Sequence, residues 1–291
     1  MTETTIPDLM RHAASTYGAR EFLRFPDTSL SFAEADERSG RMAGALIDQG
    51  VRPGDRVAIM MDNVPGWPLS WLAVLKAGAV TVPVNVRYRA ADLEHVLRDS
   101  GAVATITTGE HAPHVPGAVH LLDALRDGTP RPPRQADPDD VANFQYTSGT
   151  TGFPKACMLT HDYWLRTARI AAGQVELRDD DVMMIAQAYS YMDPQWVTLL
   201  CLMGGIPLVV LPASPPPGSG PRPGSTARRS RTCWAPCPSC CTSSRPTRTT
   251  ATTACAWCSA RASSPACTPR SRSAGERRGA SCTAPRRAAP T

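Results

Sequence analysis

Hydrophobic and polar positions alternate between two spacings along the first 212 residues. Over residues 32–49, apolar side chains such as Ala35, Met42 and Leu46 recur at helical spacing, and Gly50 ends the run. Short apolar runs such as residues 56–61 suit buried parallel strands. The pattern predicts helices over 32–49, 65–76, 90–99, 161–175 and 194–203, and strands over 56–61, 80–84, 102–107, 119–122, 143–146, 182–186 and 207–211.

The order of these elements indicates an α/β fold. Strands alternate with helices through short turns, which predicts right-handed crossovers and mostly parallel sheets flanked by helices. Residues 126–140 are rich in Pro and Asp and are expected to form an exposed loop. Ligands of such sheets bind at the carboxyl ends of the strands, so the segment after residue 146 is the first place to look for chemistry.

Composition changes abruptly after Pro212. Residues 213–291 hold 13 of the 31 basic residues and one acidic residue, which leaves residues 1–212 with 18 basic and 25 acidic residues. The tail has no aliphatic side chain larger than alanine and only two Trp, so it cannot bury enough apolar surface to offset chain entropy. We therefore expect a domain over 1–212 and a disordered, low-complexity tail over 213–291.

The tail has the composition of GC-rich DNA translated in a shifted frame. When each codon is read one base earlier, the segment 232–241, TCWAPCPSCC, can encode LLGxMPxLL, a plausible helical segment. The third bases in this exercise are chosen, so the recovered string is consistent with a frameshift. A natural basic tail is the alternative.

Cysteines and the N-terminus bear on location. Of ten cysteines, Cys157 and Cys201 lie in the first 212 residues, which fits a reduced, cytoplasmic protein. The N-terminus lacks the basic-then-apolar pattern of a signal peptide. No apolar run reaches the roughly 18 residues that a membrane helix needs, so we expect no membrane span.

The sharpest motif is YTSGTTGFPKACMLTH, Tyr146–His161. Hydroxyls and unhindered N–H groups of Thr147, Ser148, Gly149, Thr150, Thr151 and Gly152 can form a nest for an anion, and Lys155 adds a positive charge. Such a segment suits a nucleotide triphosphate whose leaving pyrophosphate must be neutralised. It is not a Walker A loop, since Pro154 precedes the Lys and Ala156 follows it. The alternative is a Ser/Thr/Gly-rich surface loop.

This string resembles the phosphate-binding signature of the adenylate-forming superfamily, which includes acyl-CoA synthetases, luciferases and peptide-synthetase adenylation domains. LKAGAVTVPVN and GDRVAIMMDNVPGW resemble two further segments of that superfamily. The resemblance covers about residues 5–212. With suitable third bases, the shifted reading of ASCTAPRR in the tail gives GELYGSTE, which would be the superfamily's next motif.

The resemblance implies a two-step reaction. A carboxylic acid attacks the α-phosphate of ATP, with Mg²⁺, to form an acyl-adenylate, and a thiol, usually coenzyme A, then takes the acyl group. Residues 147–152 and Lys155 would hold the β- and γ-phosphates, with Lys155 as the catalytic contact. Tyr189, Tyr191 and Asp193 would border the acyl pocket, although Tyr189, Tyr191 and Trp196 are equally interpretable as core aromatics. His161 is expected to start a helix, in a structural or a functional role.

The chain departs from the superfamily in several places. Ala156 stands where Gly is usual, and Ser190-Tyr191 stands where many members carry an aromatic-His pair. The in-frame chain lacks the later Tyr-Gly-Ser/Thr-Thr-Glu segment, the ribose-binding Asp, the hinge and the C-terminal domain with its catalytic Lys. We therefore expect a truncated N-terminal domain that is inactive as written.

Three functional interpretations follow. The first is an acyl-CoA ligase acting on a small carboxylic acid, with no nucleic acid as partner and the oligomeric state left open. The second is a peptide-synthetase-type adenylation domain, which would need a carrier domain. The third is a basic nucleic-acid-binding protein that uses the Arg-rich tail; this is disfavoured because the tail has no Tyr or Phe for stacking.

Overall fold

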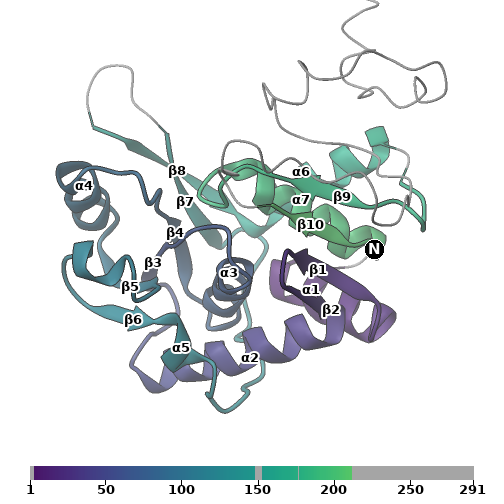
Figure 1. Cartoon of the computed structure of the whole chain (residues 1–291), viewed down its shortest axis with the longest axis horizontal. Helices are drawn as coiled ribbons and strands as arrows, with labels where there is room; N and C mark the ends of the chain where they lie inside the picture. The colour runs from purple at the N-terminus through teal and green to yellow at the C-terminus, as the bar shows by residue number, and fades with distance from the viewer. Residues whose placement is uncertain (1–2, 148–152, 176, 212–291) are drawn as a thin grey trace, which may run out of the picture. The chain divides into compact units, whose positions relative to one another are not determined.

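The computed structural model describes residues 3–147, 153–175 and 177–211 (Figure 1). Its helices are α1 (Ile6–Tyr17), α2 (Phe32–Asp48), α3 (Gly66–Lys76), α4 (Ala90–Ser100), α5 (Leu122–Leu125), α6 (His161–Val175) and α7 (Met192–Gly204), with a 3₁₀ turn at Ala112–His114. Its strands are β1 (Glu21–Phe25), β2 (Thr28–Ser31), β3 (Arg56–Met60), β4 (Val80–Pro83), β5 (Ala102–Thr107), β6 (Val119–Leu121), β7 (Val141–Thr147), β8 (Lys155–Thr160), β9 (Met183–Ile185) and β10 (Leu208–Val210).

The strands form two sheets. The larger has the order β6-β5-β3-β4-β7-β8, in which every neighbouring pair is parallel except β7 and β8. The smaller has the order β2-β1-β10-β9, with β1, β10 and β9 parallel and β2 antiparallel to β1. The expected α/β class, with mostly parallel sheets flanked by helices, is confirmed.

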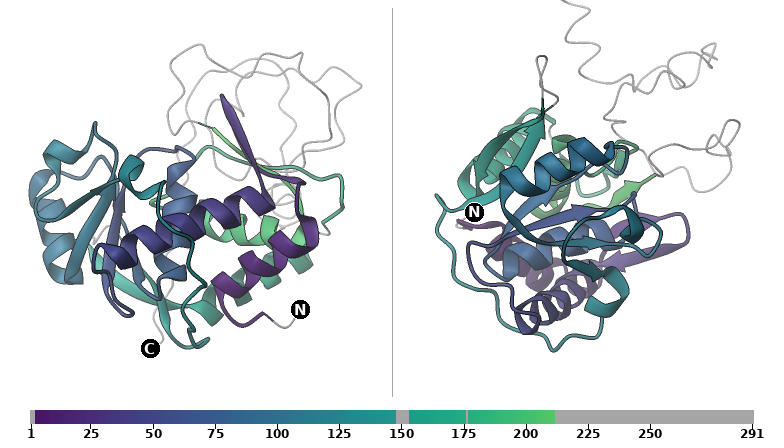
Figure 2. Two further views of the ribbon diagram at one scale, coloured as in Figure 1. Left: turned by 90° about the horizontal axis from the view of Figure 1, so that it is seen from below. Right: turned by 90° about the vertical axis from the view of Figure 1, so that its left-hand side faces the viewer.

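Alternation along β3 shows how the larger sheet is covered. Val57 and Ile59 belong to the main core, which joins both sheets through α1, α2, α3, α6 and α7. Ala58 and Met60 face the other side, where Leu93 of α4 packs against them in a smaller cluster. Figure 2 shows α2 along one side of this sheet and α4 away from the smaller sheet. A strand buried on both faces carries a continuous apolar run, which is what RVAIM supplies.

Local signals explain where the helices begin and end. Ser31 caps α2 through a reciprocal capping box with Glu34, whose carboxylate accepts from the Ser31 N–H at 2.8 Å. Hydrogen bonds from the Ser31 backbone and side chain lower the pKa of the exposed Glu34. α4 ends at Gly101 in the left-handed conformation (φ 62°), as the glycine after the predicted helix indicated.

Most predicted elements are found within two residues of their expected ends. The segment 126–140 has no helix or strand and is largely exposed, as expected. The pattern did not anticipate α1, β1 and β2, nor β8 directly after the motif. The pattern missed β8 because KACMLT lies at the sheet's edge, where none of its residues is buried, so its apolar positions follow no clear period. The predicted tail and the boundary at Pro212 lie outside the described residues.

Candidate functional site

The motif runs from the carboxyl end of β7 into β8, two antiparallel strands; the segment 147–155 that links them in the sequence is named the turn. β7 and β8 pair antiparallel from Val141↔Thr160 to Thr147↔Lys155, so the hairpin brings Thr147 opposite Lys155. The Thr147 hydroxyl donates to the Lys155 carbonyl at 3.5 Å. Five predicted phosphate contacts, Ser148, Gly149, Thr150, Thr151 and Gly152, lie outside the described residues. The structure thus places the two ends of the predicted phosphate loop, Thr147 and Lys155, opposite each other. They lie at the carboxyl ends of the parallel strands, where ligands of such sheets bind.

Lys155 is the cation of this turn. Its side chain is exposed, and it forms no ion pair with another described residue. An ammonium group without a carboxylate partner is available to pair with an incoming anion. Its place fits a phosphate contact, and the role itself stays a prediction.

α4 supports both ends of the turn. The imidazole Nε2 of His95 lies 3.0 Å from the Pro154 carbonyl, and its ring stacks on Phe153 at 4.6 Å between centroids. On the other side, the Tyr146 hydroxyl donates to Asp99 at 2.7 Å. Burial and that carboxylate both raise the pKa of Tyr146, so the phenol stays protonated as a donor. The sequence contained no signal for this support, because α4 lies about fifty residues before the motif.

Residues 189–193 lie beside β7 and join it through a hydrogen bond from Gln145 Nε2 to the Ser190 carbonyl, 2.8 Å long. Tyr189 is buried, stacks on Trp67 at 4.9 Å, and shares a hydrogen bond with Thr198 at 3.2 Å. Burial raises the pKa of Tyr189. Its side chain is thus part of the core, one of the two interpretations that the sequence left open.

Tyr191 and Asp193 differ from Tyr189. Tyr191 is 49% exposed, and its hydroxyl accepts from Asn85 Nδ2 at 3.3 Å. Asp193 is half-buried in the first turn of α7 and accepts from the indole N–H of Trp196 at 3.2 Å; Trp196 itself packs in the core. Of the predicted acyl-pocket residues, Tyr191 is the one whose ring is open to a ligand. The pocket assignment stays a prediction for all three.

His161 starts α6, as predicted, and is 3% exposed. Its Nδ1 accepts a hydrogen bond from the backbone N–H of Ile6, the first residue of α1, at 3.3 Å. Desolvation lowers the pKa of His161 to about 4, despite the nearby carboxylates of Asp140 and Asp8. A neutral imidazole joins two helix starts here, which favours the structural role.

The sequence analysis named no metal ligand, but the structure brings three possible ligands together. Asp62 follows β3, and Glu110 and His111 follow β5; one ligand atom from each lies within 4.8 Å of the others. His111 Nε2 is 2.9 Å from the Asp62 carboxylate, which already accounts for their closeness as an ion pair. No second feature among the described residues points to an ion there.

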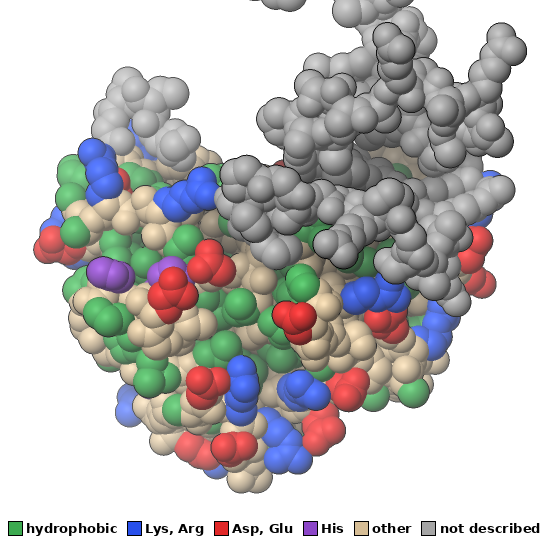
Figure 3. Space-filling model, in the orientation of Figure 1, with side chains coloured by type: hydrophobic (Ala, Val, Ile, Leu, Met, Phe, Trp, Pro, Cys, Tyr) green, Lys and Arg blue, Asp and Glu red, His purple; other side chains and the backbone are tan. Residues whose placement is uncertain are grey.

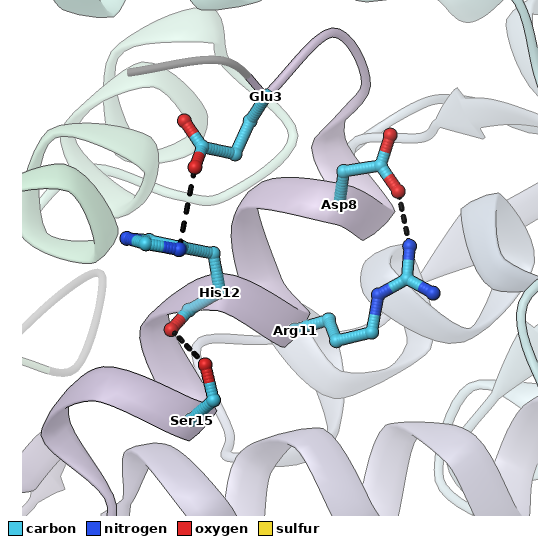
Figure 4. A pocket seen from close by; sticks show the side chains of 5 residues that line it. All are labelled: Glu3, Asp8, Arg11, His12 and Ser15. Atoms are coloured by element: carbon cyan, nitrogen blue, oxygen red, sulfur yellow. Dashed lines mark hydrogen bonds and ion pairs between the residues drawn. The ribbon is translucent and has the colours of Figure 1, made fainter.

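A shallow surface hollow at α1 is lined by Glu3, Asp8, Arg11, His12 and Ser15 (Figure 4). Arg11 pairs with Asp8, and His12 Nδ1 lies 3.3 Å from one carboxylate oxygen of Glu3. Ser15 donates to the His12 carbonyl at 2.8 Å. The second carboxylate oxygen of Glu3, Oε2, is buried and has no hydrogen-bond partner among the described residues.

The face drawn in Figure 3 intersperses basic and acidic side chains over its lower part. Within α2, Arg41 pairs with Glu37 at 3.0 Å. Among the helices of the described residues, none combines the length and apolar character needed to cross a membrane. Cys157 is exposed and Cys201 buried, and both are free thiols.

Comparison with known sequences decides the family. The sequence model of the family described as "AMP-binding enzyme" matches residues 10–241. The chain belongs to this family. The match covers most of the chain and runs past the composition break at Pro212.

The chain is also similar in sequence to two proteins of larger size. A feruloyl-CoA synthase from Amycolatopsis sp. is 39% identical over 173 residues, 56% of this chain and 35% of that protein. The phosphinothricin tripeptide synthetase PhsC from Streptomyces viridochromogenes is 36% identical over 167 residues, 54% of this chain and 15% of that protein. The chain thus spans about a third or less of the length of these relatives.

A solved structure agrees with the fold. The N-terminal domain of FACL13 from Mycobacterium tuberculosis, crystallised with an inhibitor, superimposes with a TM-score of 0.68 at 25% identity, covering 72% of this chain and 58% of that one. The two-sheet architecture described above is therefore that of an N-terminal domain of an adenylate-forming enzyme.

Proposed function

We propose that this chain carries the phosphate-binding part of an ATP-dependent acid–thiol ligase, which joins a carboxylic acid to coenzyme A through an acyl-adenylate. The observation that carries the proposal is the β7–β8 hairpin, which sets Thr147 opposite Lys155 at the carboxyl edge of the larger sheet. Membership of the AMP-binding enzyme family and the similarity to a feruloyl-CoA synthase support it.

The described residues fit one part of this chemistry. Thr147 offers a hydroxyl, and the exposed Lys155 offers a charge to the phosphates of ATP. Contacts of α4 with Tyr146 and with the Pro154 carbonyl fix the backbone next to Thr147 and Lys155 before the nucleotide arrives. Mg²⁺ would shield the phosphates and coenzyme A would supply the thiol; no described residue is assigned to either.

The finer claims belong to the same proposal. The domain boundary is at Pro212, residues 213–291 are read out of frame, and the chain as written completes no adenylation. Resequencing the gene across codons 205–220 tests the boundary. Acid-dependent exchange between ATP and pyrophosphate tests the inactivity, since exchange reports adenylate formation without any thiol.

The expected result of the exchange assay is a rate equal to a blank without protein, for fatty and aryl acids alike. Clear acid-dependent exchange by the chain would show that its in-frame part suffices for adenylation. The gene product restored by a one-base correction near codon 212 is the matched positive control, and it should exchange.

A second candidate is a peptide-synthetase-type adenylation domain, which the similarity to a tripeptide synthetase favours. The thiol acceptor separates the two. With the restored protein, acyl transfer to coenzyme A supports the ligase, whereas adenylation of an acid with no transfer to coenzyme A supports the adenylation domain.

A further inference from the structure

The segment between β9 and α7 has no regular structure over residues 187–191, yet its backbone is held by side-chain amides. Asn63 is the first: its Oδ1 accepts from the Tyr189 N–H at 3.0 Å, and its Nδ2 donates to the Gln187 carbonyl at 2.9 Å. Asn63 also donates to the Leu211 carbonyl at 3.0 Å, which ties the end of β10 to the same point.

Two glutamines donate hydrogen bonds to the carbonyls of Tyr189, Ser190 and Tyr191. Gln195 Nε2 donates to the carbonyls of Tyr189 and Tyr191 at 3.0 and 3.1 Å. Gln145 Nε2 donates to the Ser190 carbonyl at 2.8 Å. Irregular backbone must find partners for its polar groups, and here they come from strand β7 and helix α7.

Asn143 fixes the two glutamines in turn. Its Nδ2 donates to Gln145 Oε1 at 3.1 Å and to Gln195 Oε1 at 3.2 Å, and its Oδ1 accepts from Thr81 on β4. Asn143 and Gln195 are fully buried and Gln145 is 6% exposed. A buried amide network is stable only when each member is satisfied, so these side chains have one arrangement available.

We propose that Asn63, Asn143, Gln145 and Gln195 form an amide clamp, a set of positioning residues that fixes residues 187–191 relative to β7. Gln145 lies two residues before Thr147 on the same strand, so the clamp holds residues 187–191, next to the predicted acyl pocket, at a constant distance from Thr147. The clamp itself does not depend on the proposed function. Only the assignment of residues 189–193 to an acyl pocket and of Thr147 to a phosphate site rests on that proposal.

Hydrogen exchange of the chain, without ATP or acid, tests the clamp directly. Gln195→Met keeps an unbranched side chain of similar volume but loses both donors. Exchange in peptides covering 187–193 should become about tenfold faster, the factor expected for the loss of a buried hydrogen bond. Peptides from α2 and β3 should keep the wild-type rate. Gln135→Met, in the exposed loop, is the matched control and should change neither region.

Two results would overturn the clamp: a wild-type exchange rate at 187–193 in folded Gln195→Met, or equal acceleration in all peptides, which would mark a contribution to global stability alone.

Should the variant not fold, spectra of the side-chain amides in the wild-type chain provide the test. The NH₂ protons of Asn143 and Gln195 should exchange at least about tenfold more slowly than those of Gln135; equal rates refute the clamp. In folded Gln145→Met, the Asn143 and Gln195 amide resonances should shift. Because no nucleotide is present, a failed clamp and a failed ligase assignment are separate results.

Discussion

Acidification should destabilise this chain through His161. The buried imidazole has a pKa of about 4 in the fold, against an ordinary value of 6.5. Between these values the unfolded chain binds a proton that the folded chain excludes, so stability falls as pH drops through this window and is fully present above about pH 7. Integrating the two titrations gives a loss of about 2 kcal/mol at pH 5 and about 3 kcal/mol at pH 4.

The assay is urea denaturation followed by circular dichroism at pH 7, 6 and 5, on wild type and His161→Asn. Asparagine keeps an acceptor oxygen for the Ile6 N–H but does not titrate. Other groups, including His120, whose pKa is also lowered by burial, titrate alike in both proteins and cancel in the difference. Wild type should lose about 2 kcal/mol more than His161→Asn between pH 7 and 5. Equal losses would refute the neutral, buried imidazole.

Two further predictions concern stability. The buried Lys76 donates to the Asp36 carboxylate at 2.7 Å, and burial lowers the pKa of Lys76. Asp36→Ala leaves the buried ammonium with two neutral acceptors, the backbone carbonyl of residue 36 and the Ser39 hydroxyl, and should cost about 2–3 kcal/mol. Lys76→Met should cost less than about 1 kcal/mol in the same urea assay, and the reverse order would contradict the pairing. Tyr146→Phe removes the donor to Asp99 and should cost about 1 kcal/mol by thermal melting, with no loss expected from the exposed Tyr163→Phe as control.

The sequence predicted the parallel strands and their helices well because those elements are buried on one or two faces, as β3 is by its run of apolar residues. It failed at β8, where the strand is an exposed edge and burial imposes no period. The sequence singled out the motif because glycines, hydroxyls and Lys155 stand together in the chain, and the phosphate contacts stay a prediction.

The amide clamp was beyond reach of the sequence for a different reason. Its members come from the loop after β3, from β7 and from α7, up to 148 residues from the groups that they hold. The only local signal is the presence of Asn143 and Gln145 among the apolar residues of a strand, ANFQY. Polar side chains in such a strand indicate partners, but the partners are set by tertiary packing.

Lys155→Ala in the frame-restored gene product tests the central claim, that the turn from Thr147 to Lys155 holds the phosphates of ATP, most directly. Removing a charge aimed at the leaving pyrophosphate should slow adenylation from ATP by about 10²–10³-fold. Thiolation from a supplied acyl-adenylate should stay close to wild type, because pyrophosphate has left before that step. Equal impairment of adenylation and thiolation, or full adenylation by Lys155→Ala, would contradict the claim.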